Sequence, residues 1–151
     1  MKKEMPIRDK ETYARMSLRD FIIASCRLEK GELRLSAFRT YKAERRLLQC
    51  LAMVHGIHNR NTPCAVPKHD MERTASQLEK LYPGILEMTR KALKLFDQWK
   101  LSNPRRKDIV ELLLKINFSW ISQFLNSKDI EQINQIRDSL LKKERSEHID
   151  V

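Results

Sequence analysis

Apolar residues return every three to four positions along most of this chain, and this spacing constrains its fold more than any other feature. It places the apolar side chains on one face of an α-helix, whereas a half-buried strand would alternate apolar and polar residues. The sequence contains no β-hairpin signal, no repeat at a solenoid period and no low-complexity tract. Helices are therefore the expected building blocks.

The length of the chain sets the number of domains. With 151 residues, a chain buries about 70% of the surface that it exposes when unfolded, which is enough for one core. We predict an all-α fold: a single domain over residues 1–151, built as an antiparallel helical bundle of five or six helices. Residues 1–8 and 143–151 are expected to fray.

Two helices are predicted in the N-terminal third. The first is capped by Asp9 or Thr12 and ends near Lys30. Its inner face is predicted to carry Tyr13, Met16, Ile22, Ile23 and Cys26. The second runs from about Glu32 to His55, and its inner face carries Ala37, Phe38, Tyr41, Leu48, Leu51 and Val54. We expect these two helices to pack together.

A long loop, about 57–69, is predicted next, because two prolines and two asparagines interrupt the helical spacing there. Asp70 is then expected to cap a helix that Pro83 breaks, and a new helix to run from Pro83 to Trp99. Asn103 and Pro104 are expected to begin the clearest helix, with a stripe at Ile109, Leu112, Leu113, Ile116, Trp120 and Phe124. Ser127 is expected to cap the last helix, which carries Ile130, Ile133, Ile136 and Leu140.

Positive charge is concentrated near the N-terminus. The chain holds 30 Lys or Arg and 20 Asp or Glu, a net charge of +10. The first fifty residues hold 13 basic and 7 acidic side chains, so they supply six of these ten charges. A concentrated positive field attracts polyanions and raises their encounter rate. An anionic partner is therefore expected for this part of the chain.

A basic face is predicted on the second helix. Arg39, Lys42 and Arg46 recur at steps of three and four, so a helix aligns them along one side. Arginine suits phosphate because its guanidinium donates two hydrogen bonds at once. With the flanking residues, the predicted nucleic-acid-binding set is Arg27, Lys30, Arg34, Arg39, Lys42, Arg45 and Arg46. The alternative is a plain solvated face whose long side chains shield the core.

Two functions follow from these patterns. The first is a non-catalytic accessory or regulatory protein that binds nucleic acid, RNA or DNA, through phosphate contacts. The second is a protein–protein interaction adaptor that binds an acidic partner or forms a homo-oligomer. Its interface would use an apolar surplus at Leu33, Leu35, Leu47 and Met53. A membrane partner is not expected, because the apolar faces of the helices are needed for the core.

The predicted loop and its borders carry His55, His58, Cys64 and His69. Imidazole and thiolate are the ligands that zinc prefers, which makes these four residues zinc candidates. Their spacing matches no zinc finger, so we predict no metal and no cofactor.

Catalytic arrangements lack support in the sequence. Cys64 with His58 or His69 would form a nucleophile pair, but nothing specifies an oxyanion hole. Arg60 and His69 could serve a ribonuclease, yet their spacing fits no motif. A helix-turn-helix around 126–127 fits weakly, because carboxylates follow the turn. We therefore predict that the protein is not an enzyme.

The cysteines and the hydropathy pattern indicate in which compartment of the cell the protein is expected. Cys26, Cys50 and Cys64 are odd in number and form no CxxC pair, which favours reduced thiols. No secretory signal is readable, and no apolar run approaches the roughly 20 residues that cross a bilayer. We predict a cytoplasmic protein.

Overall fold

The computed structural model describes the backbone of residues 8–149 and the side chains of residues 8–144. Within that range all regular elements are helices and there is no strand, which confirms the all-α prediction. The elements are α1 (Lys10–Glu29), α2 (Leu33–Val54), the 3-10 helix η1 (Lys68–Asp70), α3 (Met71–Leu78), α4 (Ile85–Lys100), α5 (Arg106–Lys115), the 3-10 helix η2 (Phe118–Phe124) and α6 (Ser127–Ile149).

Six α-helices lie within the predicted number, whereas the two 3-10 helices were not predicted. Of the ends that we expected to fray, residues 1–7 and 150–151 lie outside the described residues, and α6 runs to Ile149. Among the described helices, none combines the length and the apolar content that crossing a bilayer requires.

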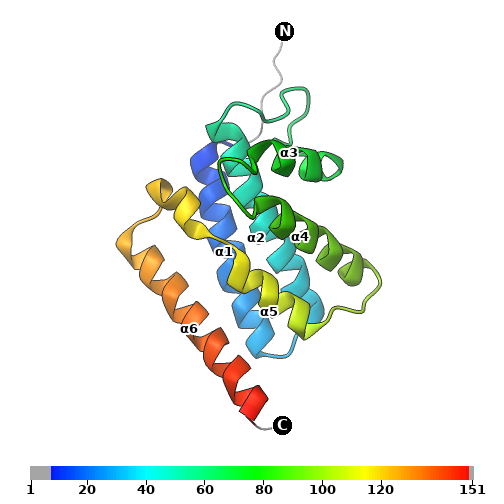
Figure 1. Ribbon diagram of the computed structural model, residues 1–151, viewed down its shortest axis with the longest axis vertical. Coiled ribbons are helices and arrows are strands. Elements are labelled where there is room, and N and C mark those ends of the chain that lie inside the picture. Colours follow the sequence, from blue (N-terminus) through cyan, green and yellow to red (C-terminus); the bar gives the residue numbers. More distant parts are fainter. Residues whose placement is uncertain (1–7, 150–151) are drawn as a thin grey trace.

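An antiparallel hairpin of α1 and α2 forms the base of the bundle (Figure 1). The two helices approach closely because small residues line their contact. Ser17 Oγ donates to the Ala43 carbonyl at 2.6 Å, and Ser36 Oγ donates to the Ala24 carbonyl at 2.8 Å. These buried hydroxyls satisfy their hydrogen-bonding capacity without widening the gap between the helices.

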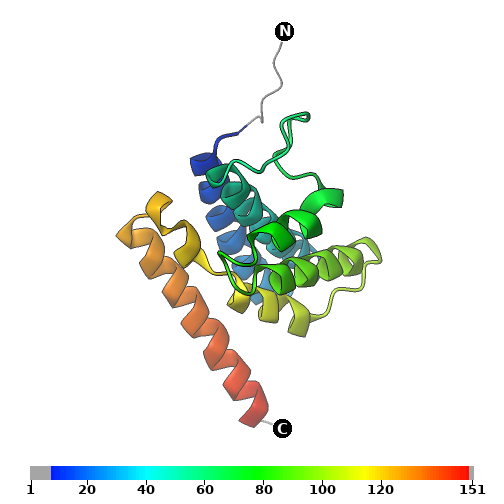
Figure 2. The same cartoon turned by 45° about the horizontal axis from the view of Figure 1, so that its top comes forward.

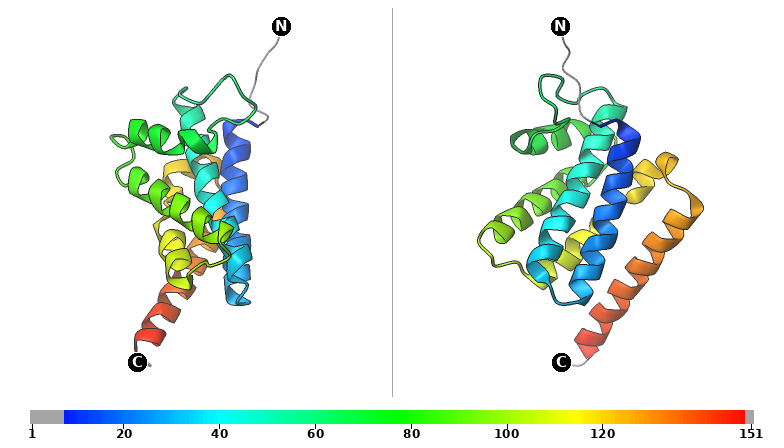
Figure 3. Two further views of the ribbon diagram at one scale, coloured as in Figure 1. Left: turned by 90° about the vertical axis from the view of Figure 1, so that its right-hand side faces the viewer. Right: turned by 180° about the vertical axis from the view of Figure 1, so that it is seen from behind.

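The other helices cover one side of this hairpin (Figures 1 and 2). α4 packs on α2, and α3 and α5 extend that layer, while α6 lies along the edge of α1. Viewed from behind, α1 and α2 run side by side in front of the remaining helices (right-hand view of Figure 3). The outer face of the hairpin is therefore uncovered by any other described helix.

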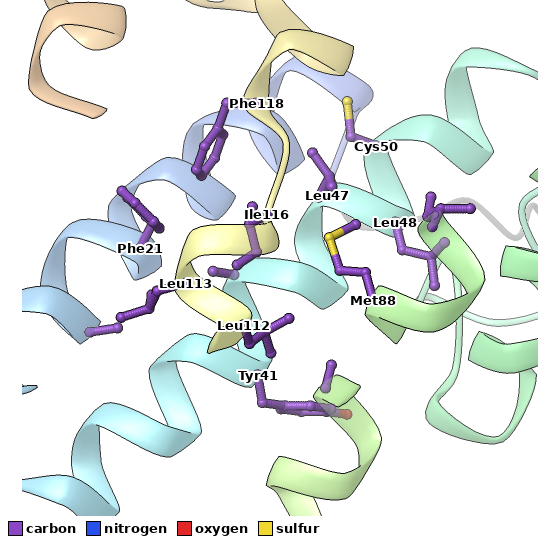
Figure 4. Close-up of a cluster of buried hydrophobic side chains, with 14 of the residues drawn as sticks. Phe21, Tyr41, Leu47, Leu48, Cys50, Met88, Leu112, Leu113, Ile116 and Phe118 are labelled. Atoms are coloured by element: carbon purple, nitrogen blue, oxygen red, sulfur yellow. The ribbon is translucent and has the colours of Figure 1, made fainter. Parts of the chain in front are cut away.

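The core lies between the hairpin and the layer of α4 and α5 (Figure 4). Phe21 of α1 meets Phe118 edge-on with ring centroids 4.9 Å apart. Leu47, Leu48 and Leu112 fill the space between α2 and the covering helices. A single cluster of buried apolar side chains thus joins the six α-helices and η2 of the described residues, whereas η1 contributes none.

The inner face of α1 differs from the prediction. Cys26 is exposed and Met16, Ile22 and Ile23 are only partly buried. Tyr13 is buried as predicted, and the other buried positions are Ala14, Ser17, Leu18, Asp20, Phe21, Ala24 and Leu28. Small and polar residues occupy the helix contact here, so apolar spacing alone did not locate this contact.

Helix ends follow the local rules in part. Asp9 accepts a hydrogen bond from the Thr12 backbone N–H at 2.8 Å, so Asp9 is the cap of α1. α5 begins at Arg106 rather than at Pro104, and Gln98 Oε1 accepts from the Arg105 backbone N–H at 3.0 Å. The expected cap at Asn103 is therefore replaced by a side chain from α4.

The predicted long helix through Phe124 is broken. Ile116 is extended, with φ −60° and ψ 120°, and its side chain is fully buried. Asn117 then caps the 3-10 helix η2 by accepting from the Ser119 backbone N–H at 3.0 Å. The segment before the 126–127 turn is thus a 3-10 helix, which is inconsistent with a helix-turn-helix.

Candidate nucleic-acid interface

The outer face of α2 carries Arg39, Lys42 and Arg46, as the sequence predicted. Asp20 of α1 anchors one end of this row, because Arg39 Nη1 donates to Asp20 Oδ1 at 2.8 Å. The Asp20 side chain is 5% exposed, whereas that of Arg39 remains 40% exposed. The buried carboxylate of Asp20 therefore orients the Arg39 side chain, which remains accessible to solvent.

Mutual repulsion acts within this row. Burial lowers the pKa of Lys42, and the neighbouring Arg46 and Arg39 lower it further. Burial likewise lowers the pKa of Arg46. Arg45 and Arg8 also lower the pKa of Arg46, whereas Asp20 acts in the opposite direction on both Lys42 and Arg46. The cations of this row outnumber the carboxylate beside them, which leaves a positive field.

Positive charge continues from this row onto α1. An open hollow of about 550 Å³ is lined by Arg8, Glu11, Thr12, Arg15, Met16 and Arg19. Arg15 is held by Asp129 of α6, with which it forms an ion pair. Arg8 and Arg19 were missed by the sequence analysis, which took basic residues from α2 and from the end of α1.

Two of the predicted residues lie at the turn between α1 and α2. Arg27 Nη1 forms an ion pair with Glu32 Oε1 at 2.9 Å, and both side chains are about two-fifths exposed. Lys30, which follows the last residue of α1, is exposed. This end of the face is accordingly less positive than its centre.

Arg45 points toward the long loop and does not extend an open surface. Its Nη2 atom donates to Cys64 Sγ at 3.1 Å and to the Val66 carbonyl at 3.2 Å. Gln49 is fully buried and donates from Nε2 to the same sulfur at 3.2 Å. These contacts hold the loop against α2, so Arg45 contributes charge to the face and also has a structural role.

An aromatic edge lies where α2 meets α4, and we define it as Phe38, Phe96 and Trp99. Phe38 stacks on Trp99, with ring centroids 4.5 Å apart and planes at 26°. Phe96 packs at 5.4 Å from Trp99 and at 4.8 Å from Tyr41, which is buried behind it. All three rings of the aromatic edge are partly exposed.

Three cations lie over the aromatic edge. The Arg34 guanidinium is 4.9 Å from the Trp99 ring, Lys42 Nζ is 5.4 Å from Phe38, and Lys68 Nζ is 4.6 Å from Phe96. The sequence analysis placed Phe38 and Trp99 in inner stripes and so missed this cluster. Its one visible signal was the four-residue spacing of Arg34, Phe38 and Lys42, which puts an aromatic ring between two cations on one helix face.

No protein-family model, curated protein or solved structure matches this chain. Function must therefore be inferred from the residues of the chain itself. The cationic outer face and the aromatic edge are the two features from which that inference starts.

The apolar surplus predicted for a protein interface is largely consumed by the core. Leu47 is fully buried, so it cannot contribute to a surface. Leu33 and Met53 are partly buried and pack against the core. Leu35 alone of the four is exposed, at 48%. The prediction of an interface through Leu33, Leu35, Leu47 and Met53 is therefore wrong for Leu47 and weakened for two others.

The four zinc candidates do not converge. His55 Nε2 lies 2.7 Å from Tyr82 Oη, Cys64 contacts Arg45 and Gln49, and the His69 side chain is 81% exposed. Across residues 8–144, no three His, Cys, Asp or Glu side chains are placed to hold a metal ion. The sulfur of Cys64 thus accepts hydrogen bonds from Arg45 and Gln49. A nucleophilic cysteine would instead require a histidine in contact with its sulfur.

Proposed function

We propose that this protein is a non-catalytic nucleic-acid-binding accessory or regulatory protein whose α2 outer face contacts the phosphates of RNA or DNA. The observation that carries this proposal is the row of Arg39, Lys42 and Arg46 on α2, which lies beside the carboxylate of Asp20. Arg39, Lys42 and Arg46 are the contacting residues, and Arg34, Lys30 and Arg27 extend the contact along the hairpin.

Electrostatics supports an anionic ligand on this face. Crowded cations raise the free energy of the unbound protein, and a phosphate placed among them relieves that repulsion. Guanidinium groups at Arg39 and Arg46 suit phosphate because each can donate two hydrogen bonds. The face is helical and uncovered, so it would meet the sugar-phosphate backbone and recognise its shape more than its sequence.

The competing adaptor function has lost most of its apolar interface, because Leu47 lies in the core. An acidic protein would still meet the same cations, and this remains an outcome that the binding experiment can reveal. The cytoplasmic location proposed from the three unpaired cysteines is compatible with either partner.

The test is the affinity for labelled RNA and duplex DNA over a series of salt concentrations. Each phosphate that the protein neutralises adds about 0.7 to 0.9 to the slope of log K against log salt. Lys42→Glu should weaken binding and reduce this slope, whereas Lys142→Glu on the exposed side of α6 should change it much less. Lys42 is chosen because Arg39→Glu would place a second carboxylate against buried Asp20.

Two results would oppose the proposal. Absence of binding at low salt removes nucleic acid as the partner and leaves an acidic protein as the alternative. Equal losses in the Lys42→Glu and Lys142→Glu variants would mean that net charge, and not the α2 outer face, determines affinity.

A further inference from the structure

We infer that the nucleic acid is single-stranded and that its bases stack on the aromatic edge while the surrounding cations hold its phosphates. This inference rests on the proposed function and specifies the ligand of the same face. It concerns Phe38 and Trp99 in the first place, with Phe96 continuing the edge toward the long loop.

The arrangement of ring and charge distinguishes the aromatic edge from ordinary core packing. Packing in the core does not require a cation on the outer side of a ring. Here Trp99, Phe38 and Phe96 each carry one, from Arg34, Lys42 and Lys68 respectively. Aromatic surface lined by basic residues is the combination that single-strand-binding proteins use, because every nucleobase has a flat face that can stack.

The three cations come from elements that are distant in sequence. Arg34 and Lys42 belong to α2, whereas Lys68 belongs to η1 at the end of the long loop. η1 precedes α3, and Arg45 holds the adjoining Val66 carbonyl at 3.2 Å. The loop is thus fixed where it supplies a cation to the edge, which gives its unusual length a role.

A base can replace a cation on these rings. Arg34 and Lys68 are exposed, and their long side chains can turn toward a phosphate without disturbing the core. An exposed cation over a ring contributes less than a stacked base does, so the exchange favours the bound state. Duplex bases already stack on one another, and their faces are inaccessible to protein rings. The edge therefore selects single strands.

The length of the aromatic edge sets the size of the ligand. The ring centroids of Phe38 and Trp99 lie 4.5 Å apart, and that of Phe96 lies 5.4 Å from Trp99. A surface of this length accommodates about two or three stacked bases, as a sheet-based RNA-binding module does. The rest of a longer strand would follow the cations of the α2 outer face.

The two tryptophans allow a direct test, because the chain contains only Trp99 and Trp120. Trp120 packs against Tyr82 and lines a hollow with Pro83 and Gly84, at the opposite end of α4 from Trp99. Trp120→Phe leaves Trp99 as the sole tryptophan, and Trp99→Phe leaves Trp120. Both changes retain an aromatic ring, so both proteins should fold.

Each single-tryptophan protein is titrated with an oligodeoxythymidylate of about 10 nucleotides, within the range of known single-strand sites. A second titration uses an abasic strand of equal length and charge. We expect the thymidylate to quench the emission of Trp99 and to leave that of Trp120 unchanged, and the abasic strand to quench neither. Trp99→Leu should weaken thymidylate binding by about tenfold, whereas Trp120→Leu should not.

The outcomes separate this inference from the proposed function. If both strands bind equally and Trp99 emission does not change, stacking is refuted while phosphate contact by the α2 outer face stands. If neither strand binds at low salt, both proposals fail. Quenching of Trp120 in place of Trp99 would move the site to the other end of α4 and refute the role of the aromatic edge.

Discussion

Replacing Glu44 with glutamine should make the stability of the protein much less dependent on pH. Glu44 is fully buried between α2 and α4. Thr89 Oγ1 donates to its Oε2 atom at 2.6 Å, while Oε1 has no hydrogen-bond partner. Burial raises the pKa of this carboxyl from 4.5 to about 7, against the opposing effects of Thr89 and Arg45.

The sign of the effect follows from which form the folded state prefers. A raised pKa means that folding favours the neutral carboxyl, so its contribution to stability is complete below about pH 4.5 and is lost as pH rises through about 7. A shift of about two and a half pKa units corresponds to about 3 kcal/mol in total. Between about pH 5 and about pH 8 the stability lost is about 2 to 3 kcal/mol.

Glutamine cannot ionise, so it removes this pH dependence. Its amide donors lack partners beside Thr89, which costs about 1 kcal/mol at every pH. The Glu44→Gln protein should thus be no more stable than the wild type near pH 5 and clearly more stable near pH 8.

Urea unfolding of both proteins at the two pH values measures the difference. Taking the change between pH values for each protein cancels the titration of all other groups. Glu87→Gln, on an exposed position of α4, serves as the control for the loss of one carboxylate. If the unfolding free energies of the wild type and of Glu44→Gln change with pH in parallel, the pKa of the Glu44 carboxyl is not raised by burial.

Two further perturbations test the helix ends. Gly84 precedes α4 with φ 100° and has open space around its Cα, so Gly84→Ala should cost only the backbone strain, about 1 to 2 kcal/mol in urea unfolding. Equal stability would show that another backbone conformation is accessible there. Asn126, and not the predicted Ser127, caps α6, because its Oδ1 accepts from the Asp129 backbone N–H at 2.8 Å. Asp129 in turn accepts from the Asn126 backbone N–H at 3.0 Å and pairs with Arg15. Asp129→Asn should lower the stability of α6 by about 1 kcal/mol and accelerate its amide exchange, with α2 unaffected; uniform acceleration would contradict this local role.

Local rules predicted those parts of the fold that depend on neighbours in sequence. Asp9 caps α1 because its carboxylate reaches an amide three residues on. Gly56, with φ 68°, follows the end of α2, where a left-handed residue favours glycine. A break near Pro83 was predicted and is present, but α3 already ends at Leu78 and α4 begins at Ile85 rather than at Pro83. The order and type of the α-helices could therefore be derived without the structure.

Features that depend on distant residues could not be derived in this way. The helix ends at Ile116, whose backbone is extended and whose side chain is buried in the core, although apolar residues continue at helical spacing beyond this point. Leu47 was assigned to an interface because the side chains that bury it come from other helices, which the sequence of α2 does not reveal. Helical spacing alone aligns Arg39, Lys42 and Arg46 along α2, but the pairing of Phe38 with Trp99 required the packing of α4 on α2. The aromatic edge was thus invisible to helical spacing alone.

The α1–α2 hairpin has a consequence for the order in which the protein is assembled. Its two helices are joined by only three residues, 30–32, and make the most extensive contact in the molecule. Contacts close in sequence form rapidly, and the N-terminal part of a chain leaves the ribosome first. Phe96 and Trp99 are supplied later, by α4. During synthesis, we expect the cationic face of α2 to be complete while two of the three rings that would hold a base are still missing.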